Sequence, residues 1–458
     1  MNQTVLTENK MGVMPIGKLL ANMAIPMMIS MLVQAFYNVV DSIFVSRISE
    51  NALTAVSLAF PLQNLSIAVG AGTAVGMNAV LSRSLGEKRQ DLVDRSANTG
   101  IFLFFCSYLV FAFIGLFLTR TFFLAQTDVA EIVEYGVSYS SICLTFSMGI
   151  FFQFCFERML QSTGRTGLAM VTQLIGAVIN IILDPILIFG LFGLPAMKVA
   201  GAAIATVIGQ IVAAIIAVWI NLKKNKDVHI RLKLIRFDKE IASEIYRVGL
   251  PSIVMQSISS VMTFGVNRIL IKFSTTATAV FGAYFKLQSF IFMPVFGLNN
   301  AMVPIISYNY GAARADRVKR TVLLTICTAI GIMGLGFAAF ELIPEVLLSL
   351  FDASGHMLAI GVPALRIIGT HFMLAGFCII AGSVCQAIGN PVYSLINSVC
   401  RQLLVLLPVA WLLSLSGRLE MVWLAFPIAE LVSVLLSSVF LRKTMKAANV
   451  SMEARKGE

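Results

Sequence analysis

Two acidic residues stand inside hydrophobic segments of this chain, where a charge is costly. Asp184 lies in the run Asn180-Ile-Ile-Leu-Asp184-Pro185-Ile-Leu-Ile-Phe-Gly190, and Asp41 lies near the end of the first hydrophobic segment. An ionisable group within a bilayer is costly unless it is paired, hydrated or protonated, and such groups mark ion and proton pathways. We therefore expect a site that carries ions or protons.

The two acids are expected at a similar depth. The first segment begins near Lys18 and ends near Arg47, which places Asp41 about six residues, or roughly 9 Å at 1.5 Å per residue, from its far end. Asp184 stands about six residues before Gly190, in a segment that runs in the same direction. The two carboxylates should therefore meet in the outer part of the N-terminal half.

Polar neighbours support a binding site around the two acids. Asn180 lies four residues before Asp184, on the same face of a helix, and Asn38 lies nearly one turn before Asp41. Pro185 has no N–H and frees carbonyl groups beside Asp184. Two carboxylates in a low-dielectric pocket cannot both be ionised cheaply, so the site should hold a proton or a small cation such as Na⁺. Oxygen ligands for a hard cation are expected from Asp41, Asn180, Asp184 and Thr206. The alternative is that both acids only hydrogen-bond to neighbouring helices.

Composition defines the class of protein. Of the 458 residues, 58% are hydrophobic and only 12% are charged, and the mean hydropathy is +0.87. No soluble domain of this size has such a composition, so we predict an all-α polytopic membrane protein. About twelve transmembrane helices are expected, at 18–46, 53–82, 97–119, 132–160, 168–190, 198–222, 245–272, 278–308, 321–342, 356–388, 391–416 and 420–442.

The net charge of +11 follows the sidedness of a membrane. With the N-terminus inside, the outer connections hold few basic residues, and the other loops hold many, as the positive-inside rule predicts. Both termini should therefore be cytoplasmic. The basic segment 223–239 is expected to bind anionic membrane lipids and not nucleic acid.

The chain repeats itself at one constant offset. Leu62-Gln63 recurs as Leu287-Gln288, and Pro26 recurs as Pro251 at the same spacing. Six helices per repeat keep both halves in the same orientation, so we expect two six-helix bundles related by a pseudo-twofold axis along the membrane normal. The predicted division is an N-terminal lobe at 1–222, a basic cytoplasmic linker at 223–243, and a C-terminal lobe with a short cytoplasmic tail at 244–458. Such a layout suits alternating access.

Motifs for an enzyme or a metal site are not apparent. The seven cysteines all fall in predicted spans, and no histidine or carboxylate stands at ligand spacing beside Cys378 and Cys385, which share one helix face. No nucleophile motif or sizeable soluble domain is visible. We therefore expect no catalytic residues, no metal site and no cofactor.

Five stretches together carry a family resemblance. They are Ile25-Pro26-Met27-Met28, Tyr37 to Asp41, Asn180 to Gly190, Val199 to Thr206, and Gly311-Ala312-Ala313. The chain resembles the multidrug and toxic compound extrusion (MATE) family, in its MepA-like bacterial branch, over nearly its whole length. The resemblance implies a secondary active antiporter of the bacterial plasma membrane, which exports cationic, amphipathic drugs in exchange for H⁺ or Na⁺. It also implies a coupling-ion site in the N-terminal lobe, formed by Asp41, Asp184, Asn180 and Thr206.

The C-terminal lobe departs from the pattern of some family members, because its spans at 245–272 and 356–388 contain no acid. A polar cluster is predicted there instead, made of Lys286, Arg366, Arg401 and Glu430. Glu430 is expected to neutralise one of the three bases, and a structural ion pair is weighed against a role in gating.

The substrate is the least determined part of the prediction. Soft or polar side chains expected to line a central cavity are Gln34, Gln63, Met255, Gln256, Phe285 and Gln288. Substrates are expected to be small molecules, and the transporter is expected to be a monomer. The alternative function is a flippase for a lipid-linked precursor or polysaccharide, which the bases of the C-terminal lobe favour and the acid pair disfavours.

Overall fold

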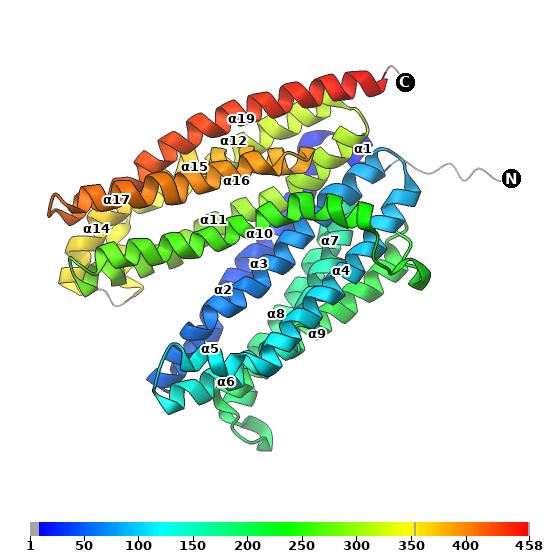
Figure 1. The fold of residues 1–458 in the computed structure, drawn as a ribbon. Coiled ribbons are helices and arrows are strands. Elements are labelled where there is room, and N and C mark those ends of the chain that lie inside the picture. The colour runs from blue at the N-terminus through cyan, green and yellow to red at the C-terminus, as the bar shows by residue number, and fades with distance from the viewer. Residues whose placement is uncertain (1–8, 352–353, 457–458) are drawn as a thin grey trace. The chain divides into compact units, whose positions relative to one another are not determined.

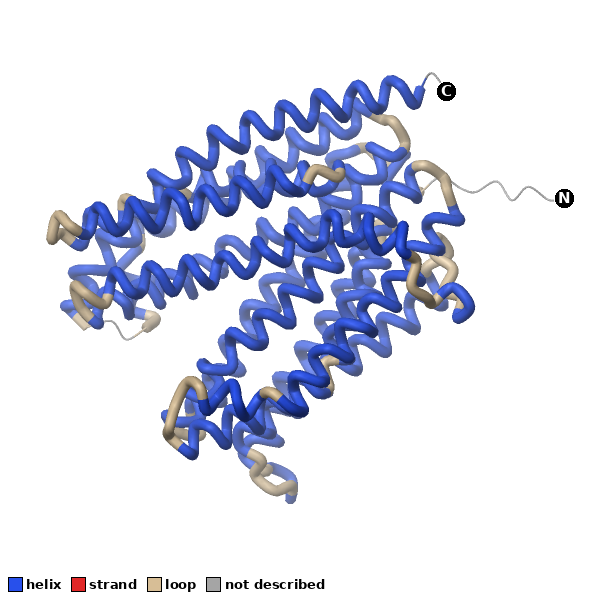
Figure 2. Tube along the Cα trace, viewed as in Figure 1, coloured by secondary structure: helices blue, strands red, loops and turns tan. Residues whose placement is uncertain are grey.

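The structure, a computed structural model, describes residues 9–351 and 354–456, which are almost entirely helical and contain no β-strand (Figure 2). Within these residues, ten helices are long and apolar enough to cross a membrane, and two further pairs of bent helices bring the number to twelve if each pair is one span. The predicted all-α membrane protein with about twelve spans is confirmed. The two chain ends, to which the topology prediction refers, lie outside the described residues.

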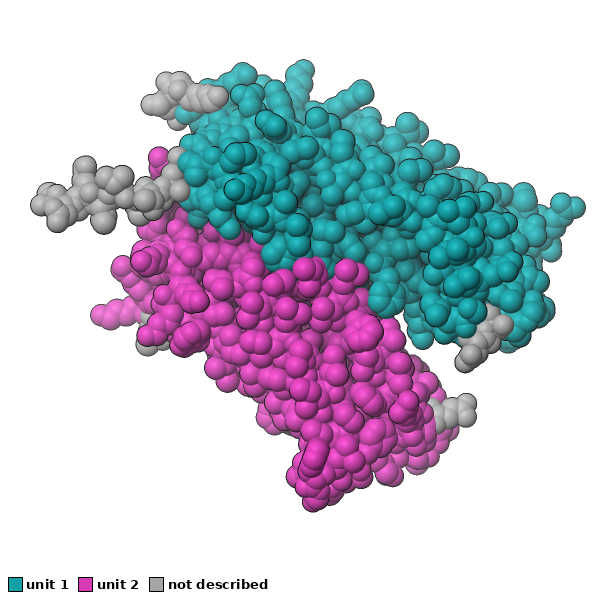
Figure 3. Space-filling view, turned by 180° about the vertical axis from the view of Figure 1, so that it is seen from behind, with its two compact units in different colours: residues 1–28, 254–458 teal, residues 29–253 magenta. Residues whose placement is uncertain are grey.

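The helices gather into two compact units, which Figure 3 shows in different colours. Unit 2 comprises residues 29–253, and unit 1 comprises residues 1–28 and 254–458. Helices within unit 2 are α3 (Glu50–Gly86), α4 (Gln90–Phe117), α5 (Thr119–Leu124), α6 (Ala130–Thr145), α7 (Met148–Ser162), α8 (Thr166–Phe189), η1 (Leu191–Gly193), α9 (Lys198–Lys224) and η2 (Leu232–Leu234).

Unit 1 contains one short N-terminal helix and the second half of the chain (Figure 1). Its helices are α1 (Lys10–Val13), α11 (Thr275–Gly311), α12 (Ala315–Leu342), α13 (Pro344–Ser349), α14 (Gly355–Gly369), α15 (Phe372–Ile388), α16 (Pro391–Val399), the π-helical segment η3 (Cys400–Leu406), α17 (Leu407–Ser414), α18 (Leu419–Trp423) and α19 (Ala425–Lys456).

Two long helices belong partly to each unit. They are α2 (Ile16–Ser46), which changes unit after residue 28, and α10 (Lys239–Leu270), which changes unit after residue 253. Each contains a proline two residues before the change, Pro26 or Pro251, and proline cannot complete the helical hydrogen-bond ladder. The predicted lobes at 1–222 and 244–458, with their linker, stay a prediction about how the chain divides in function.

The internal repeat extends to the ends of the helices. α3 and α11 are each 37 residues long, α4 and α12 are each 28 residues long, and each pair begins at equivalent positions of the repeat. Ser49 and Ser274 cap α3 and α11 by accepting hydrogen bonds from backbone N–H groups three residues on, at 3.1 and 3.0 Å. Lys88 and Ala313, in the turns that follow, both have a positive φ, of 56° and 54°. The same N-cap and the same turn conformation therefore occur in both halves of the chain.

Two predicted spans are broken, which corrects their assignment as single helices. The span predicted at 132–160 consists of α6 and α7, bent by 42°, and the span predicted at 356–388 consists of α14 and α15, bent by 47°. At each break a backbone N–H bonds to the residue three positions earlier, from Ser147 to Leu144 and from His371 to Ile368. No proline stands at either break, so the apolar pattern alone gave no sign of it.

Large apolar side chains are exposed on both units. Phe117, Leu335 and Leu435 are 64%, 74% and 69% exposed. Such exposure is destabilising in water and favourable against lipid acyl chains. With the helix lengths, it identifies a multi-pass membrane protein.

In unit 2, α8 and α9 lie side by side with very close backbones (Figure 1). A Cβ atom on Gly209 would lie 2.7 Å from the backbone oxygen of Gly176, and one on Gly201 would lie 2.6 Å from that of Leu187. Small residues allow membrane helices to approach in this way. The close approach brings Thr206 of α9 against Asn180 of α8.

Candidate functional site

Asp184 lies on the inner face of α8 and is fully buried, at 0% exposure. Pro185 follows it inside the helix and offers no N–H to the carbonyl of Ile181, four residues earlier. The helix ends soon afterwards at Gly190, whose φ of 72° is of the kind that glycine adopts without strain. The carboxylate is thus held inside unit 2, beside a weakened turn of helix.

Asp41 of α2 meets Asp184 within unit 2. The two carboxyl groups lie within hydrogen-bonding reach of each other, and the Tyr37 hydroxyl lies within electrostatic range of both. Oδ1 of Asp41 is buried and has no hydrogen-bond partner in the described part of the chain. Two carboxylates this close repel each other unless a proton or a cation stands between them.

The Asn180 amide connects the acid pair to α9. With its nitrogen turned toward Asp184, Nδ2 donates to Oδ2 of Asp184 at 3.2 Å, and its oxygen accepts from Oγ1 and N of Thr206 at 3.2 and 3.1 Å. In the opposite orientation, the amide nitrogen reaches Thr206 Oγ1 at 3.2 Å. In either orientation, Asn180 connects Asp184 to Thr206. The carboxylate oxygens of Asp41 and Asp184 are suited to a proton or a hard cation.

Three further groups surround the acid pair and were not expected there from the sequence. Gln63 of α3 donates from Nε2 to the hydroxyl of Tyr139 at 3.2 Å, and Tyr139 is buried on α6. Cys143, one turn further along α6, lies within electrostatic range of Asp41, as Tyr139 does. The four-residue spacing of Tyr139 and Cys143 places them on one face of α6, but nothing in the sequence indicated that this face meets the acid pair.

Within the described part of the chain, Asn38 and the predicted cavity residues other than Gln63 are not among the groups that surround the acid pair. The Asn38 side chain is exposed, and its backbone carbonyl accepts a hydrogen bond from Ser42 Oγ at 2.9 Å. The six residues predicted to line a cavity are all partly buried and are divided between the units. Gln34 and Gln63 belong to unit 2, and Met255, Gln256, Phe285 and Gln288 belong to unit 1. Their role stays a prediction.

The four charged residues predicted as one cluster in unit 1 are not gathered together, which corrects that expectation. Nη1 of Arg401 and Oε2 of Glu430 form an ion pair at 3.0 Å, and Glu430 is only 2% exposed. Arg366 instead reaches Glu341 at 3.9 Å, with both side chains about half exposed. Lys286 is exposed and lies 5.9 Å from the ring centre of Phe351. Arg366 and Lys286 are long, exposed side chains, and each contacts a neighbour other than Glu430.

The pair in unit 1 has its own local structure. Arg401 lies in the π-helical segment η3, and Glu430 lies in α19, which packs against η3. A π-helical turn holds one residue more than an α-helical turn, and such segments occur often at functional sites. Oε1 of Glu430 is buried without a hydrogen-bond partner among the described residues. The pair is therefore charge-balanced but not fully hydrogen-bonded.

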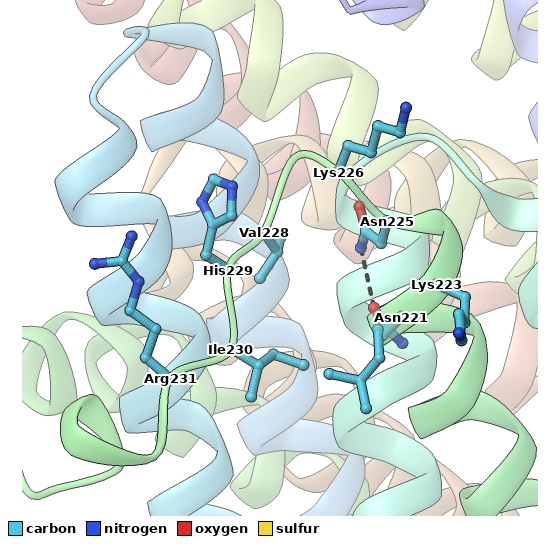
Figure 4. Close-up of a pocket in the computed structure, with 9 residues that line it drawn as sticks. Asn221, Lys223, Asn225, Lys226, Val228, His229, Ile230 and Arg231 are labelled. Carbon is cyan, nitrogen blue, oxygen red and sulfur yellow. Dashed lines mark hydrogen bonds between the residues drawn. The ribbon is translucent and has the colours of Figure 1, made fainter.

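The loop between α9 and α10 is tied to unit 2 by charged contacts. A hollow of about 550 Å³ is lined by nine residues of the 221–231 segment, including His229 and Arg231 (Figure 4). His229 contacts Asp94 of α4, and Asp238 pairs with Arg95 of α4 at 2.7 Å. Burial acts to raise the pKa of Asp238, but hydrogen bonds from Arg95 outweigh it and hold the pKa below its ordinary value. None of the predicted coupling residues lines this hollow.

A comparison with protein families identifies the chain. The MatE family profile matches residues 26–186 and 251–412, which together form most of the sequence. The two matched segments begin at Pro26 and Pro251, which are equivalent positions of the internal repeat.

Curated relatives cover nearly the whole chain. A FAD transporter of Shewanella oneidensis is 27% identical, over 91% of this chain and 92% of the relative. The probable multidrug resistance protein YoeA of Bacillus subtilis is 26% identical, over 95% of each chain. The multidrug export protein MepA of Staphylococcus haemolyticus is 26% identical, over 92% of each chain.

Solved structures agree with these relatives. An outward-facing multidrug resistance MATE family transporter of the MOP superfamily has a TM-score of 0.91 and 27% identity, over 96% of this chain and 98% of that one. A MOP superfamily transporter from Pyrococcus furiosus, described as having a binding pocket of reverse polarity, has a TM-score of 0.88 and 26% identity over the same shares. The chain therefore belongs to the MatE family, the multidrug and toxic compound extrusion transporters, and is not an enzyme.

Proposed function

We propose that this chain is a secondary active antiporter that exports cationic, amphipathic compounds in exchange for H⁺ or Na⁺. The observation that carries the proposal is the meeting of Asp41 and Asp184 in unit 2, with Asn180 and Thr206 beside them. A titratable or cation-binding site inside an apolar bundle is what coupling to an ion gradient requires.

The coupling follows from the charge of the acid pair. When a proton or a cation occupies the pair, the repulsion between the carboxylates is removed, and α2 and α8 can pack closely. When the ion leaves, the repelling carboxylates favour a wetter, more open arrangement, which admits a substrate. The ion and the substrate thus prefer different conformations, and this difference in binding free energy is what drives exchange.

The substrate class is proposed from the named relatives and from the predicted cavity. Two of the relatives are multidrug export or resistance proteins, and one is a FAD transporter. Amides and soft side chains, such as Gln34, Gln256 and Met255, can adapt to different molecules and add no fixed charge. We therefore propose dissimilar organic cations as substrates, with FAD as the comparison compound that tests this choice.

Efflux from proteoliposomes tests the proposal. Asp41→Asn and Asp184→Asn are each expected to lower the initial rate of ethidium efflux by roughly tenfold or more, because the neutral amide cannot bind the coupling ion. Asp128→Asn, a change at an exposed carboxylate between α5 and α6, is the matched control and should leave the rate unchanged. Full efflux by both site variants would refute the proposed mechanism.

The driving ion is separated by imposing one gradient at a time. A pH gradient without Na⁺, a Na⁺ gradient at equal pH, and no gradient form the three conditions. Wild-type efflux under the first condition alone assigns H⁺, and efflux under the second alone assigns Na⁺. Equal efflux under all three would contradict ion coupling. Replacing ethidium with FAD under the productive condition tests the substrate class.

The flippase alternative is less well supported by the charged residues of unit 1. Two of the three predicted bases, Arg366 and Arg401, have carboxylate partners, Glu341 and Glu430, so their charges are already balanced, and Lys286 lies beside Phe351. A strongly cationic cavity for an anionic lipid precursor would need unbalanced bases.

We also propose that both termini lie in the cytoplasm of a bacterial cell and that the basic segment 223–239 contacts anionic lipids. The transporter is proposed to act as a monomer without a cofactor. Cysteine labelling from either side of sealed vesicles, at exposed positions in the 225–238 and 125–129 loops, tests the orientation. Labelling of the 125–129 loop from the cytoplasmic side would overturn it.

A further inference from the structure

Unit 2 contains a third buried acid, Glu157, which takes no part in the Asp41–Asp184 site. It lies on α7, five residues before the helix ends at Ser162, and is only 2% exposed. No Lys, Arg or His forms an ion pair with it among the described residues, although its chain neighbour Arg158 acts on it electrostatically. A buried carboxylate without an ion-pair partner needs an explanation.

Three uncharged side chains hold the Glu157 carboxylate. Oε1 accepts from Gln153 Nε2 at 3.0 Å and from Thr172 Oγ1 at 2.9 Å, and Oε2 accepts from Gln173 Nε2 at 2.7 Å. Gln153 lies on α7, and the other two lie on α8. These bonds orient the carboxylate without cancelling its charge.

The Thr172 hydroxyl can serve both protonation states of Glu157. It has one hydrogen but lies within bonding distance of two acceptors, Glu157 Oε1 at 2.9 Å and the backbone oxygen of Ala169 at 2.7 Å. When Glu157 is ionised, the hydroxyl donates to it. When a proton binds Oε1, the Thr172 hydroxyl donates to Ala169 instead, and its oxygen accepts a hydrogen bond from the protonated carboxyl group. Gln173 Oε1, buried without a partner in the described residues, offers a second acceptor if its amide turns over.

The same arrangement disfavours a metal cation. Both amides present nitrogen, not oxygen, to the carboxylate, and an N–H donor repels a cation. Hard cations need several oxygen ligands, and Glu157 with Thr172 provides few. A proton needs one oxygen to bind and one acceptor to receive its hydrogen bond.

Several charged residues on the neighbouring elements pair with one another. α7 packs against α3, α4, α8 and α9. At this end of unit 2, Arg83 pairs with Glu244, Arg95 with Asp238, Arg165 with Asp227, and Asp94 with His229. Nη1 of Arg158 donates to Gln161 Oε1 at 2.8 Å.

A buried row along α8 connects Glu157 to the acid pair. Thr172, Gly176, Asn180 and Asp184 follow one another at intervals of four residues, and all are buried. Thr172 and Asp184 are twelve residues apart, or roughly 18 Å along the helix. Glu157 lies near the end of unit 2 that carries the 86–90, 163–165 and 225–238 connections, and Asp184 lies toward the other end.

We propose that Glu157, held by Gln153, Thr172 and Gln173, is a second proton-binding site of unit 2. It takes a proton from water and returns it to water at the end of the unit that carries the 225–238 loop. The proton forms an O–H bond with Oε1, which donates a hydrogen bond to Thr172 Oγ1, while the Thr172 hydroxyl donates to the backbone oxygen of Ala169. This role rests on the proposed antiport with H⁺, but the binding of the proton itself does not.

Infrared difference spectra of the purified protein, recorded between alkaline and acidic pH, test the proposal independently of transport. A buried carboxyl group gains a carbonyl stretching band when it becomes protonated. We expect one such band to disappear in Glu157→Gln and to persist in the Asp41→Asn, Asp184→Asn double variant. A band pattern in folded Glu157→Gln identical to that of the wild type would overturn the proposal.

Thr172 variants keep the test decisive if Glu157→Gln fails to fold. Thr172→Val removes the acceptor and should shift both the frequency of the Glu157 band and the pH at which it appears, whereas Thr172→Ser should restore both. If Thr172→Val changed neither the frequency of the Glu157 band nor the pH at which it appears, the proposal would be contradicted. If Glu157→Gln loses its band while Asp41→Asn and Asp184→Asn transport normally, the second site stands and the proposed function fails.

Discussion

Unit 2 holds two carboxylates within reach of each other, whereas unit 1 holds a carboxylate paired with a guanidinium. Asp41 and Asp184 carry the same charge and have only neutral neighbours, such as Asn180. Glu430 and Arg401 carry opposite charges and lie 3.0 Å apart. An acid pair changes its charge when an ion binds, but a matched ion pair has little reason to do so.

The two polar centres differ in sequence although they belong to an internal repeat whose backbone is similar in both halves. In the second half of the chain, the repeat positions of Asp41, Asn180 and Asp184 are occupied by Val266, Val405 and Val409. In the first half, those of Arg401 and Glu430 are occupied by Gly176 and Ala205. The ends of α3 and α4 are thus duplicated in α11 and α12, but neither polar centre is duplicated. The two halves of the chain thus share a fold but differ in their buried polar residues. We therefore expect ion coupling in unit 2 alone.

The largest expected change is in the free energy of unfolding when the ion pair of unit 1 is broken. Glu430→Gln leaves Arg401 without its partner and should destabilise the protein by about 3 kcal/mol, because a partly buried charge loses its compensation. The double variant Arg401→Met, Glu430→Leu should recover most of that loss. Thermal unfolding in detergent measures both.

The acid pair should behave in the opposite way. Asp184→Asn removes a repelling charge and should not destabilise the folded protein. If the Arg401, Glu430 double variant proved as unstable as Glu430→Gln, or if Asp184→Asn were the less stable of the two single variants, the contrast between the units would be broken.

The second prediction sharpens the contrast inside unit 2. Asn180→Ala removes a hydrogen bond to a carboxylate and should weaken binding of the coupling ion by about tenfold. Thr206→Val removes only the hydroxyl that faces Asn180 and should weaken it by about threefold. Titration of ethidium binding against pH or Na⁺ measures both changes. Val405→Ala, at the repeat position of Asn180, is the control, and an equal effect there would contradict a site confined to unit 2.

Much of the fold could be predicted from the sequence, because hydrophobic runs and the internal repeat are local or periodic signals. The depth of Asp41 and Asp184 followed from the helical rise alone, and the structure brings the two together. The bends after Thr145 and Thr370 could not be predicted, because the apolar pattern continues through them and neither has a proline.

Contacts between helices could not be predicted from the sequence either. Tyr139 meets Gln63 from a helix that is distant in sequence, and a single chain gives no signal for that pairing. Lys286 and Arg366 were expected beside Glu430, but each has another neighbour, Phe351 or Glu341. Depth along a helix can be counted from the sequence, whereas the direction that a side chain faces depends on packing that only the structure provides.

The smallest expected effect comes from a charged pair outside the membrane. Because the pKa of Asp238 in the folded protein lies below its ordinary value, its pair with Arg95 stabilises the fold above the unfolded pKa of about 3.9 and ceases to do so as the pH falls through the folded pKa. Asp238→Asn should therefore lower stability at neutral pH by less than about 1 kcal/mol and have no effect at strongly acidic pH. A loss as large as that of Glu430→Gln would remove the distinction between hydrated and buried pairs.

The most direct test of the central claim is the release of ions when substrate binds to the purified transporter. Ethidium is added to the protein in weakly buffered detergent solution, and H⁺ and Na⁺ are measured with ion-sensitive dyes. The wild type and Asp128→Asn should release one of these ions, whereas the Asp41→Asn, Asp184→Asn double variant should bind ethidium but release less of that ion. Undiminished release from that double variant would show that the coupling ion is held elsewhere and would contradict the account.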